Sequence, residues 1–386
     1  MTTEATSANR AAKPPGFRSR IETWVGGQSE RLVSAAFIWP AVLLVLSISV
    51  FPLFVALYLG FSDVELVRGG FDIHWIGLDN FRALFSGEDK SEFLGVSGSL
   101  TPLGWLVIVA GLGLFAWGLV KAARGGVALV GLVFRALAVV FGAMLLWQVV
   151  HTLLAHGGRP GTVVTTLVFV CTGVALQFGL GLGLAYLVTL GLPGQRFFRV
   201  VFLLPMTITP VGVAYLFSML MDTDKGPLQP LFRAVGLGNW SWANSAWGAR
   251  IAVIVGDTWQ WTPFMFIVLL AALEGQDPEP IEAAVVDGAN RWRVLRDITM
   301  PAIFPIALTV ILLRLIEAFK VIDLPNVLTS GGPGTATESM TLQAYIQWRS
   351  LDIGMSAATA NCLMILVTVI AVVYVNLLRR RAVADA

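Results

Sequence analysis

"TVVTTLVFVCTGVALQFGLGLGLAYLVTL" extends from Thr162 to Leu190 and contains no charged residue. A helix needs about 20 predominantly apolar residues to cross roughly 30 Å of bilayer hydrocarbon. This run is long enough, and it is solidly apolar rather than alternating, which favours a membrane-spanning helix over a barrel strand. The stretch therefore predicts an all-α fold inside a membrane.

The composition of the whole chain extends this prediction. Of its 386 residues 56% are hydrophobic and 13% are charged, and the mean hydropathy is +0.77, values far from those of an ordinary soluble domain. Long apolar runs recur, and we expect a polytopic helical bundle of about eight spans. They are Val33 to Gly60, Pro102 to Val120, Val127 to Ala155, Thr162 to Leu190, Val200 to Met221, Ile251 to Leu273, Ala302 to Ile322 and Met355 to Leu378.

The distribution of Lys and Arg predicts the orientation, because basic residues are retained on the cytoplasmic side. With the N-terminus inside, 15 of the 26 basic residues fall in cytoplasmic segments. Eight crossings then return the C-terminus to the same side. Both termini and the polar segment 274–301 are therefore expected to be cytoplasmic.

The polar segment 274–301 predicts a helix-turn-helix outside the membrane. Its acidic, proline-bearing start ends the preceding helix, and Ile281 to Asp287 then forms a short helix. Gly288 permits a turn. A second helix, Ala289 to Thr299, places Trp292, Leu295 and Thr299 on one face, and Pro301 opens the next span. Such a unit either enters a groove of a partner protein or lies on the lipid surface, and the pattern alone fits both.

Several residues of this segment resemble the EAA loop of ABC-importer permeases. The matching positions are Glu282, Ala283, Ala284, Asp287, Gly288, Ala289, Ile298, Pro301 and Pro305. The resemblance implies a coupling helix that sits in a cleft of an ATP-hydrolysing subunit, with Gly288 as the pivot. Glu282, Ala283, Ala284 and Asp287 would form the contact, Ala289 would allow close approach, and Trp292 would act as an apolar anchor.

A phosphate-binding loop is missing from the sequence. Such a loop needs Gly-Lys followed by Ser or Thr, and none of the five lysines follows a glycine. The chain is therefore expected to carry no cofactor, while a separate ATPase binds ATP and Mg. The three histidines are too scattered for a metal site and no catalytic constellation is apparent, so we expect a transport subunit rather than an enzyme, without a nucleic-acid partner.

Further stretches resemble the larger membrane subunit of maltose, trehalose and glycerol-phosphate importers. They are "IGLDNFRALF" (76–85), "FRVVFLLPMTITP" (198–210), "DTWQWTPFMF" (257–266) and "IDLPNVLTSGGPGTATESM" (322–340). That family has a six-helix core, so the surplus spans resemble an inserted hairpin. The implied organisation is a tail 1–31, a first span 32–61, an external loop 62–101, the hairpin 102–155, a permease core 156–378 and a tail 379–386.

The resemblance also implies the setting of the chain. We expect a multi-pass subunit in a bacterial or archaeal cytoplasmic membrane, surrounded by lipid. Its partners would be a second homologous permease, an ATPase dimer and an extracytoplasmic sugar-binding protein or lipoprotein. The solute would be a sugar or oligosaccharide of the maltose, trehalose or glucoside class.

Polar groups inside the predicted spans are candidates for the translocation path, because lipid penalises them. The sixth span contains Asp257, Trp259, Gln260, Trp261 and Phe264, a mixture that suits sugar hydroxyls and ring faces. The alternative is that Asp257 bonds a neighbouring helix and the tryptophans only pack.

The seventh span contains two pairs at helical spacing. Arg314 with Glu317, and Lys320 with Asp323, can form ion pairs that stabilise the bundle or contact the substrate. A rival function is an ion-gradient-driven secondary transporter of a polar solute, which needs an intramembrane acidic site and for which Asp257 is the candidate.

Overall fold

The computed structural model describes residues 38–386 except 125–128, 192, 223–224, 237–241, 243–244 and 385–386. The all-α membrane fold is confirmed. Within the described residues six helices are long and apolar enough to cross a membrane, or seven if one bent pair is counted as a span. The chain divides into two compact units, Met1–Tyr58 and Leu59–Ala386. The smaller unit contributes most of the helical segment Ile38–Gly60.

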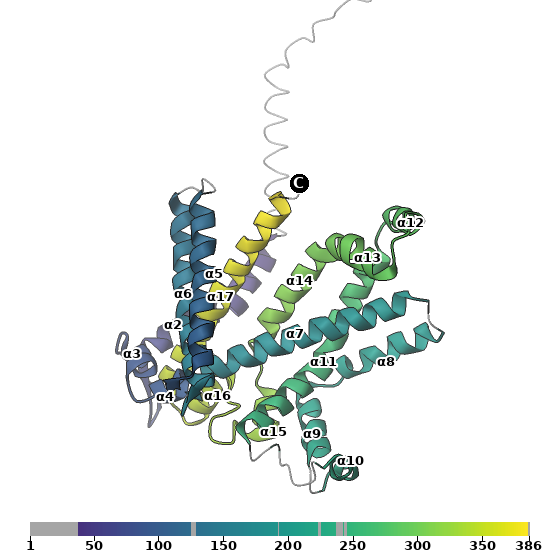
Figure 1. Cartoon of the computed structure of the whole chain (residues 1–386). Helices are drawn as coiled ribbons and strands as arrows, with labels where there is room; N and C mark the ends of the chain where they lie inside the picture. The colour runs from purple at the N-terminus through teal and green to yellow at the C-terminus, as the bar shows by residue number, and fades with distance from the viewer. Residues whose placement is uncertain are drawn as a thin grey trace, which may run out of the picture. The chain divides into compact units, whose positions relative to one another are not determined.

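The larger unit contains the remaining long helices (Figure 1). Each is close to one predicted run. They are α5 (Pro102–Arg124), α6 (Leu129–Leu153), α7 (Thr162–Thr189), α11 (Ala246–Glu274), α14 (Met300–Ala318) and α17 (Ile353–Ala384). Helices α5 and α6 pack against each other as a pair of long adjacent helices.

The predicted span Val200 to Met221 is broken into two helices. Helix α8 (Gln195–Thr207) and helix α9 (Pro210–Met221) meet at an angle of 98°. A residue before proline is pushed out of the helical region, and Thr209 is extended. Its hydroxyl caps α9 by accepting from the Gly212 N–H at 3.3 Å. The break thus lies at Pro210, whereas Pro205 stays inside α8.

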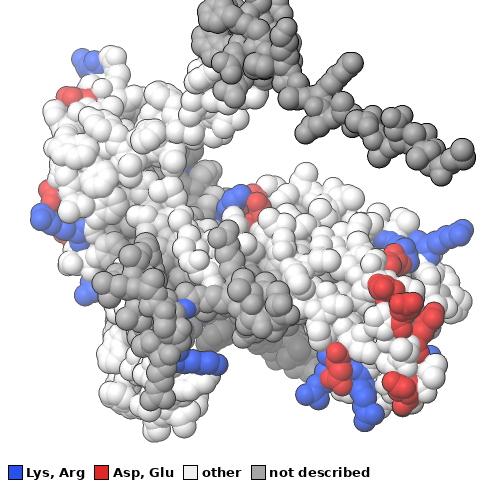
Figure 2. Space-filling model, turned by 90° about the horizontal axis from the view of Figure 1, so that it is seen from above, with Lys and Arg blue, Asp and Glu red and all other residues white. Residues whose placement is uncertain are grey.

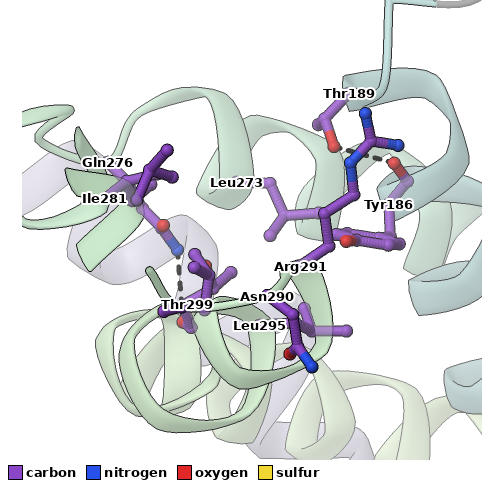
Figure 3. Close-up of a pocket in the computed structure, with 12 residues that line it drawn as sticks. Tyr186, Thr189, Leu273, Gln276, Ile281, Asn290, Arg291, Leu295 and Thr299 are labelled. Atoms are coloured by element: carbon purple, nitrogen blue, oxygen red, sulfur yellow. Dashed lines mark hydrogen bonds between the residues drawn. The ribbon is translucent and has the colours of Figure 1, made fainter. Parts of the chain in front are cut away.

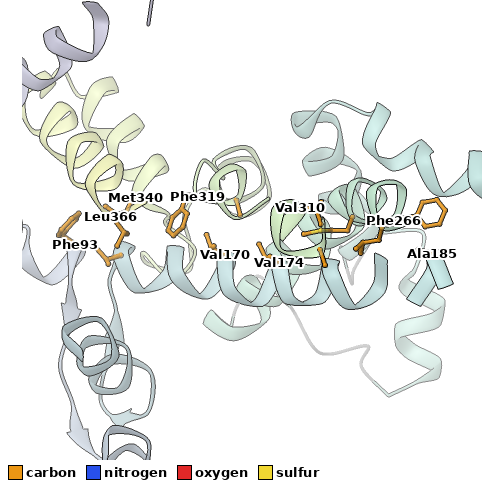
Figure 4. Packing of buried hydrophobic residues seen from close by; sticks show 14 of the residues in the cluster. Phe93, Val170, Val174, Ala185, Phe266, Val310, Phe319, Met340 and Leu366 are labelled. Carbon is orange, nitrogen blue, oxygen red and sulfur yellow. The ribbon is translucent and has the colours of Figure 1, made fainter. Parts of the chain in front are cut away.

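The core is centred on the crossing of α7 and α11. Val170 and Val174 of α7 pack with Phe266 of α11 and Val310 of α14 in one buried cluster (Figure 4). Close approach of the two backbones requires a residue without a side chain at Gly181. A Cβ there would lie 2.6 Å from the Met265 Cβ and 2.9 Å from the Phe266 N. This contact brings the α7 backbone directly against α11 at Met265 and Phe266.

The segment predicted as a loop, 62–101, is largely ordered into small elements. Strands β1 (Ser62–Val67) and β2 (Gly70–Trp75) form an antiparallel hairpin, followed by α3 (Asp79–Ser86) and α4 (Lys90–Phe93). The short strands β3 (Gly95–Val96) and β4 (Ser99–Leu100) pair with β6 (Arg159–Pro160) and β5 (Ala155–His156). These pairings join the segment to the end of the α5–α6 hairpin.

The remaining helices connect the long ones. They are α10 (Gln229–Ala234), α12 (Glu279–Val286), α13 (Arg291–Val294), α15 (Asp323–Thr329) and α16 (Met340–Arg349). Pro301 does not open a separate span, contrary to the sequence interpretation. Helix α13 continues through a π-helical turn, η3 (Leu295–Thr299), into α14. Proline lacks the N–H that an α-helical hydrogen bond requires. The π-helical turn ends with the Met300 N–H donating to the Leu295 carbonyl, one residue before Pro301.

Candidate functional site

The segment between α11 and α14 forms a projecting elbow, which we define as Glu279 to Thr299. Helix α12 ends at Val286 with Asp287 as its C-cap, and the next residue, Gly288, has a φ of 81°. The Ala289 N–H donates to the Ala284 carbonyl at 2.9 Å, and the Gly288 N–H donates to the Val285 carbonyl at 3.1 Å. This pair of bonds is a Schellman motif, which needs a left-handed residue at the helix end. The Asn290 side chain then caps α13 by accepting from the Arg293 N–H at 2.8 Å.

The elbow exposes large apolar side chains. Val286 is 86% exposed, Trp292 68% and Val285 60%. Three such residues within one short segment are more than scattered surface apolar residues, and they mark an interaction surface. The prediction that Trp292 is an exposed anchor fits this position, whereas Val285 and Val286 were not singled out from the sequence.

Acidic side chains surround this apolar face. Glu282 and Asp287 are exposed, and neither forms an ion pair among the described residues. Viewed from this end of the molecule, red and blue side chains gather at the lower right of Figure 2, and smaller charged groups lie at its left edge and centre. The exposed charged residues here are Glu274, Asp277, Glu279, Glu282, Asp287, Arg291, Arg293, Arg296 and Asp297.

The base of the elbow is tied to the helices that carry it. The Gln276 amide donates to the Thr299 carbonyl at 3.2 Å, which joins the end of α11 to the start of α14 (Figure 3). Arg199 of α8 forms an ion pair with Glu274 of α11. Behind the elbow lies a pocket of about 510 Å³, bounded by the ends of α7 and α11 and by residues such as Ala289 and Arg291. The elbow is therefore attached at its two ends and leaves space beneath it.

Asp257, Arg314 and Gln177 form a buried polar cluster that joins three helices. Arg314 Nη2 on α14 lies 2.6 Å from Asp257 Oδ2 on α11, and Arg314 Nε donates to Gln177 Oε1 on α7 at 2.7 Å. The Gln177 amide donates to Asp257 Oδ2 at 2.8 Å. The guanidinium also lies over the Trp261 ring, 4.7 Å from its centroid. With side-chain exposures of 2% for Arg314 and 13% for Asp257, these charges are neutralised within the bundle.

The other residues proposed for the path have mixed environments. Gln260 is buried and donates to the Ile208 carbonyl at 3.3 Å, a group that the α8–α9 break leaves without a helical partner. Trp259 is 38% exposed and packs edge-on against Phe217. Trp261 packs edge-on against Phe264. A substrate contact by these five residues stays a prediction.

The charge pairs expected within α14 have different partners in the structure. Arg314 pairs with Asp257 rather than with Glu317, because α11 packs beside α14 and brings a carboxylate to the buried guanidinium. Glu317 instead pairs with Lys320 at 2.8 Å, on an exposed face. Asp323 belongs to the first turn of α15, and the predicted Lys320–Asp323 pair is replaced by the Lys320–Glu317 pair. Sequence spacing indicates neighbours along one helix, but it does not indicate that Gln177 on α7 is a partner of Arg314.

Comparison with known proteins decides the family. Residues 177–383, which include the elbow and the Asp257 cluster, match the model of the binding-protein-dependent transport system inner membrane component. The chain belongs to this family. The permease is thus a multi-pass subunit of the inner membrane, and the resemblance noted from the EAA loop is confirmed.

Named relatives support the same family. The permease is 31% identical to the trehalose/maltose transport system permease protein MalF of Thermococcus litoralis, over 56% of this chain and 73% of that protein. It is 28% identical to the sn-glycerol-3-phosphate permease UgpA of Yersinia pseudotuberculosis, over 56% and 74%. A solved bacterial ABC transporter involved in import of the acidic polysaccharide alginate has a similar fold, with a TM-score of 0.65, 18% identity and coverage of 93% and 99%.

Proposed function

We propose that this permease forms the translocation path for a sugar or oligosaccharide in an ABC importer and is driven by a separate ATPase through the elbow. The observation that carries the proposal is the elbow itself. It presents exposed Val285 and Val286 beside the acids Glu282 and Asp287, which form no ion pair with any residue that the structure describes. A groove on a partner protein could bury the two valines and place positive charge beside the two acids.

The attachment of the elbow explains how force enters the membrane. The elbow connects α11 directly to α14, and Gln276 bonds Thr299 at its base. Deeper in the bundle the Asp257–Arg314 pair joins the same two helices, and Gln177 includes α7. Displacement of the elbow by a closing ATPase therefore moves these helices together, as alternating access requires.

The remaining parts of the machine follow from this role. A second homologous permease completes the path, an ATPase dimer binds ATP and Mg, and an extracytoplasmic binding protein delivers the solute. The family description, binding-protein-dependent transport, supports the last partner. The elbow and both termini are placed on the cytoplasmic side.

The class of solute is proposed from the relatives. Trehalose/maltose and glycerol-3-phosphate appear in their names, which supports a small polyhydroxylated solute.

The alternative function, an ion-gradient-driven transporter, needs a carboxylate that is free to bind and release a cation. Asp257 already has Arg314 within 2.6 Å, so the geometry favours the ATP-driven reading.

Cross-linking tests the proposal. A variant with Cys171 and Cys362 replaced by alanine receives one new cysteine at Val286, and membranes that contain the whole importer are treated with a short reagent that joins a thiol to a lysine amine. We expect a cross-link to the ATPase subunit that depends on Val286→Cys. The matched control is Leu66→Cys, which is 60% exposed on β1. Capture of the ATPase from Leu66 but not from Val286 would contradict the proposed docking.

A further inference from the structure

A second pocket lies at the end of α11 remote from the elbow. It has a volume of about 520 Å³. Helix α11 has 29 residues, which at 1.5 Å per residue separates its ends by about 43 Å, and the elbow follows its other end. With the elbow inside, this pocket opens on the outer side of the membrane. Only the assignment of the pocket to the outer side depends on the proposed function.

Three parts of the chain form the pocket. One wall is the connection between α6 and α7, from Thr152 to Pro160, and the second is the first turn of α11, Ala246 to Arg250. The third wall is the segment Pro333 to Ala336. The third wall is held in place because Thr337 bonds Thr329 at 2.5 Å and the Gly332 carbonyl at 3.1 Å. The pocket is thus a built feature, and the α5–α6 hairpin supplies one side of it.

Arg250 is the group that points to a ligand. It is 4% exposed, yet its only hydrogen bond among the described residues runs from Nε to the Ala336 carbonyl at 2.7 Å. A guanidinium has five N–H donors in a fixed planar arrangement. The donors on its two Nη atoms have no partner in the described part of the chain and are not among its fully buried atoms, so they are available to a molecule in the pocket. They are suited to a planar, bidentate anion such as a carboxylate.

The rest of the lining agrees with this polarity. Arg159 adds a second positive charge from the hairpin side, and none of the described residues that line the pocket is Asp or Glu. Trp247 lines it too, is 52% exposed and has the Arg250 guanidinium 5.1 Å from its ring centroid. The exposed indole offers a flat apolar surface on which a sugar ring can pack, and the neighbouring guanidinium groups can bind the acid group of that sugar.

We propose that this pocket is an accessory binding site for a saccharide that bears a carboxylate, such as a uronic acid unit. Arg250 binds the carboxylate through its Nη donors, Arg159 adds electrostatic attraction, and the ring packs on Trp247. The hairpin 102–155 then has a role, because its outer end completes the site. Because the ligand carboxylate and the two arginines have opposite charges, its binding should weaken as the ionic strength rises.

Direct binding to the purified chain in nanodiscs, without any binding protein, tests the proposal by titration calorimetry. The probes are digalacturonate and its neutral counterpart α-1,4-galactobiose. We expect saturable binding of digalacturonate, and binding of galactobiose weaker by about tenfold or more, as loss of a charge-assisted hydrogen bond predicts. Arg250→Gln and Trp247→Ala should each weaken binding of the acidic sugar by a similar factor.

Two further variants keep the test clear if Arg250→Gln unfolds. Arg159→Gln alters an exposed residue and should also weaken digalacturonate binding. Arg82→Gln, an exposed arginine on α3 that pairs with Asp79, should leave it unchanged. Equal binding of the two sugars, equal binding of an acidic hexapeptide, or binding indifferent to Arg159 and Arg250 would overturn the proposal. So would the absence of binding, and none of these results affects the cross-link from Val286.

Discussion

Arg314 and Asp257 form an ion pair between two membrane helices, with Nη2 and Oδ2 2.6 Å apart and the Gln177 side chain bonded to both partners. Removing one partner of a buried pair leaves an uncompensated charge and typically costs about 3–5 kcal/mol. We therefore expect Arg314→Met to destabilise the permease by this order. The free energy of unfolding in mild detergent measures the loss.

The double variant Arg314→Met with Asp257→Leu provides the control. It removes both charges, so it should be more stable than either single variant. A double variant that loses the sum of the two single losses would show that the residues act independently.

Gly288 has a φ of 81° in the elbow, and no atom lies within 4 Å of a Cβ built there. Gly288→Val is therefore opposed by backbone strain of about 1–2 kcal/mol rather than by a clash. We expect solute uptake to fall several-fold while the ATPase of the reconstituted importer continues to hydrolyse ATP. Parallel assays of uptake and phosphate release measure this uncoupling.

Gly191 is a matched control for Gly288. It has a φ of 76° and equally open space, and it follows the end of α7 near the elbow, but it is outside the proposed contact. Gly191→Val should leave the ratio of uptake to ATP hydrolysis close to that of the wild type. Equal uncoupling by both variants would argue for a general effect of strain at this end.

Val286 is the most exposed of the large apolar side chains on the elbow. Burial of a valine contributes about 1.5–3 kcal/mol, and a carboxylate in the same groove would be desolvated. We expect Val286→Asp to reduce the amount of ATPase that copurifies by about tenfold or more without a change in thermal unfolding. Leu66→Asp alters a remote exposed residue and should copurify the ATPase normally.

Glu338 precedes α16, outside the candidate spans, and is 4% exposed. Burial, followed by the negative charge of Glu92 and a side-chain hydrogen bond with it, raises the pKa of Glu338 from 4.5 to about 8. Between these values the folded protein keeps a proton that the unfolded chain has released. Folding stability should therefore decrease as the pH rises through this window, by up to about 1.4 kcal/mol per unit.

Melting temperatures at pH 5.5 and pH 8.5 check this dependence. The wild type should melt at a lower temperature at pH 8.5. Glu338→Gln should reduce the difference, because the amide stays neutral throughout, whereas Glu88→Gln, an exposed residue nearby, should not. An unchanged difference in the Glu338 variant would show that another group titrates.

Apolar length and local turn chemistry made much of the fold predictable. The run from Thr162 to Leu190 differs from α7 by a single residue at its end, and Gly288 occupies the turn that its flexibility suggested. The alternative that Asp257 bonds a neighbouring helix agrees with its ion pair to Arg314, but spacing along one helix cannot reveal which helix or which residue is the partner. The same spacing pairs Arg314 with Glu317, whereas its partners Asp257 and Gln177 are on α11 and α7. Arg250 was overlooked because it resembles any basic residue at a span end.

The right-angled corner at Ile208 has a consequence for how the membrane helices travel. Gln260 on α11 donates to the Ile208 carbonyl at 3.3 Å, and separating the two groups would cost this hydrogen bond. We therefore expect a movement of α11 to carry the bent segment with it.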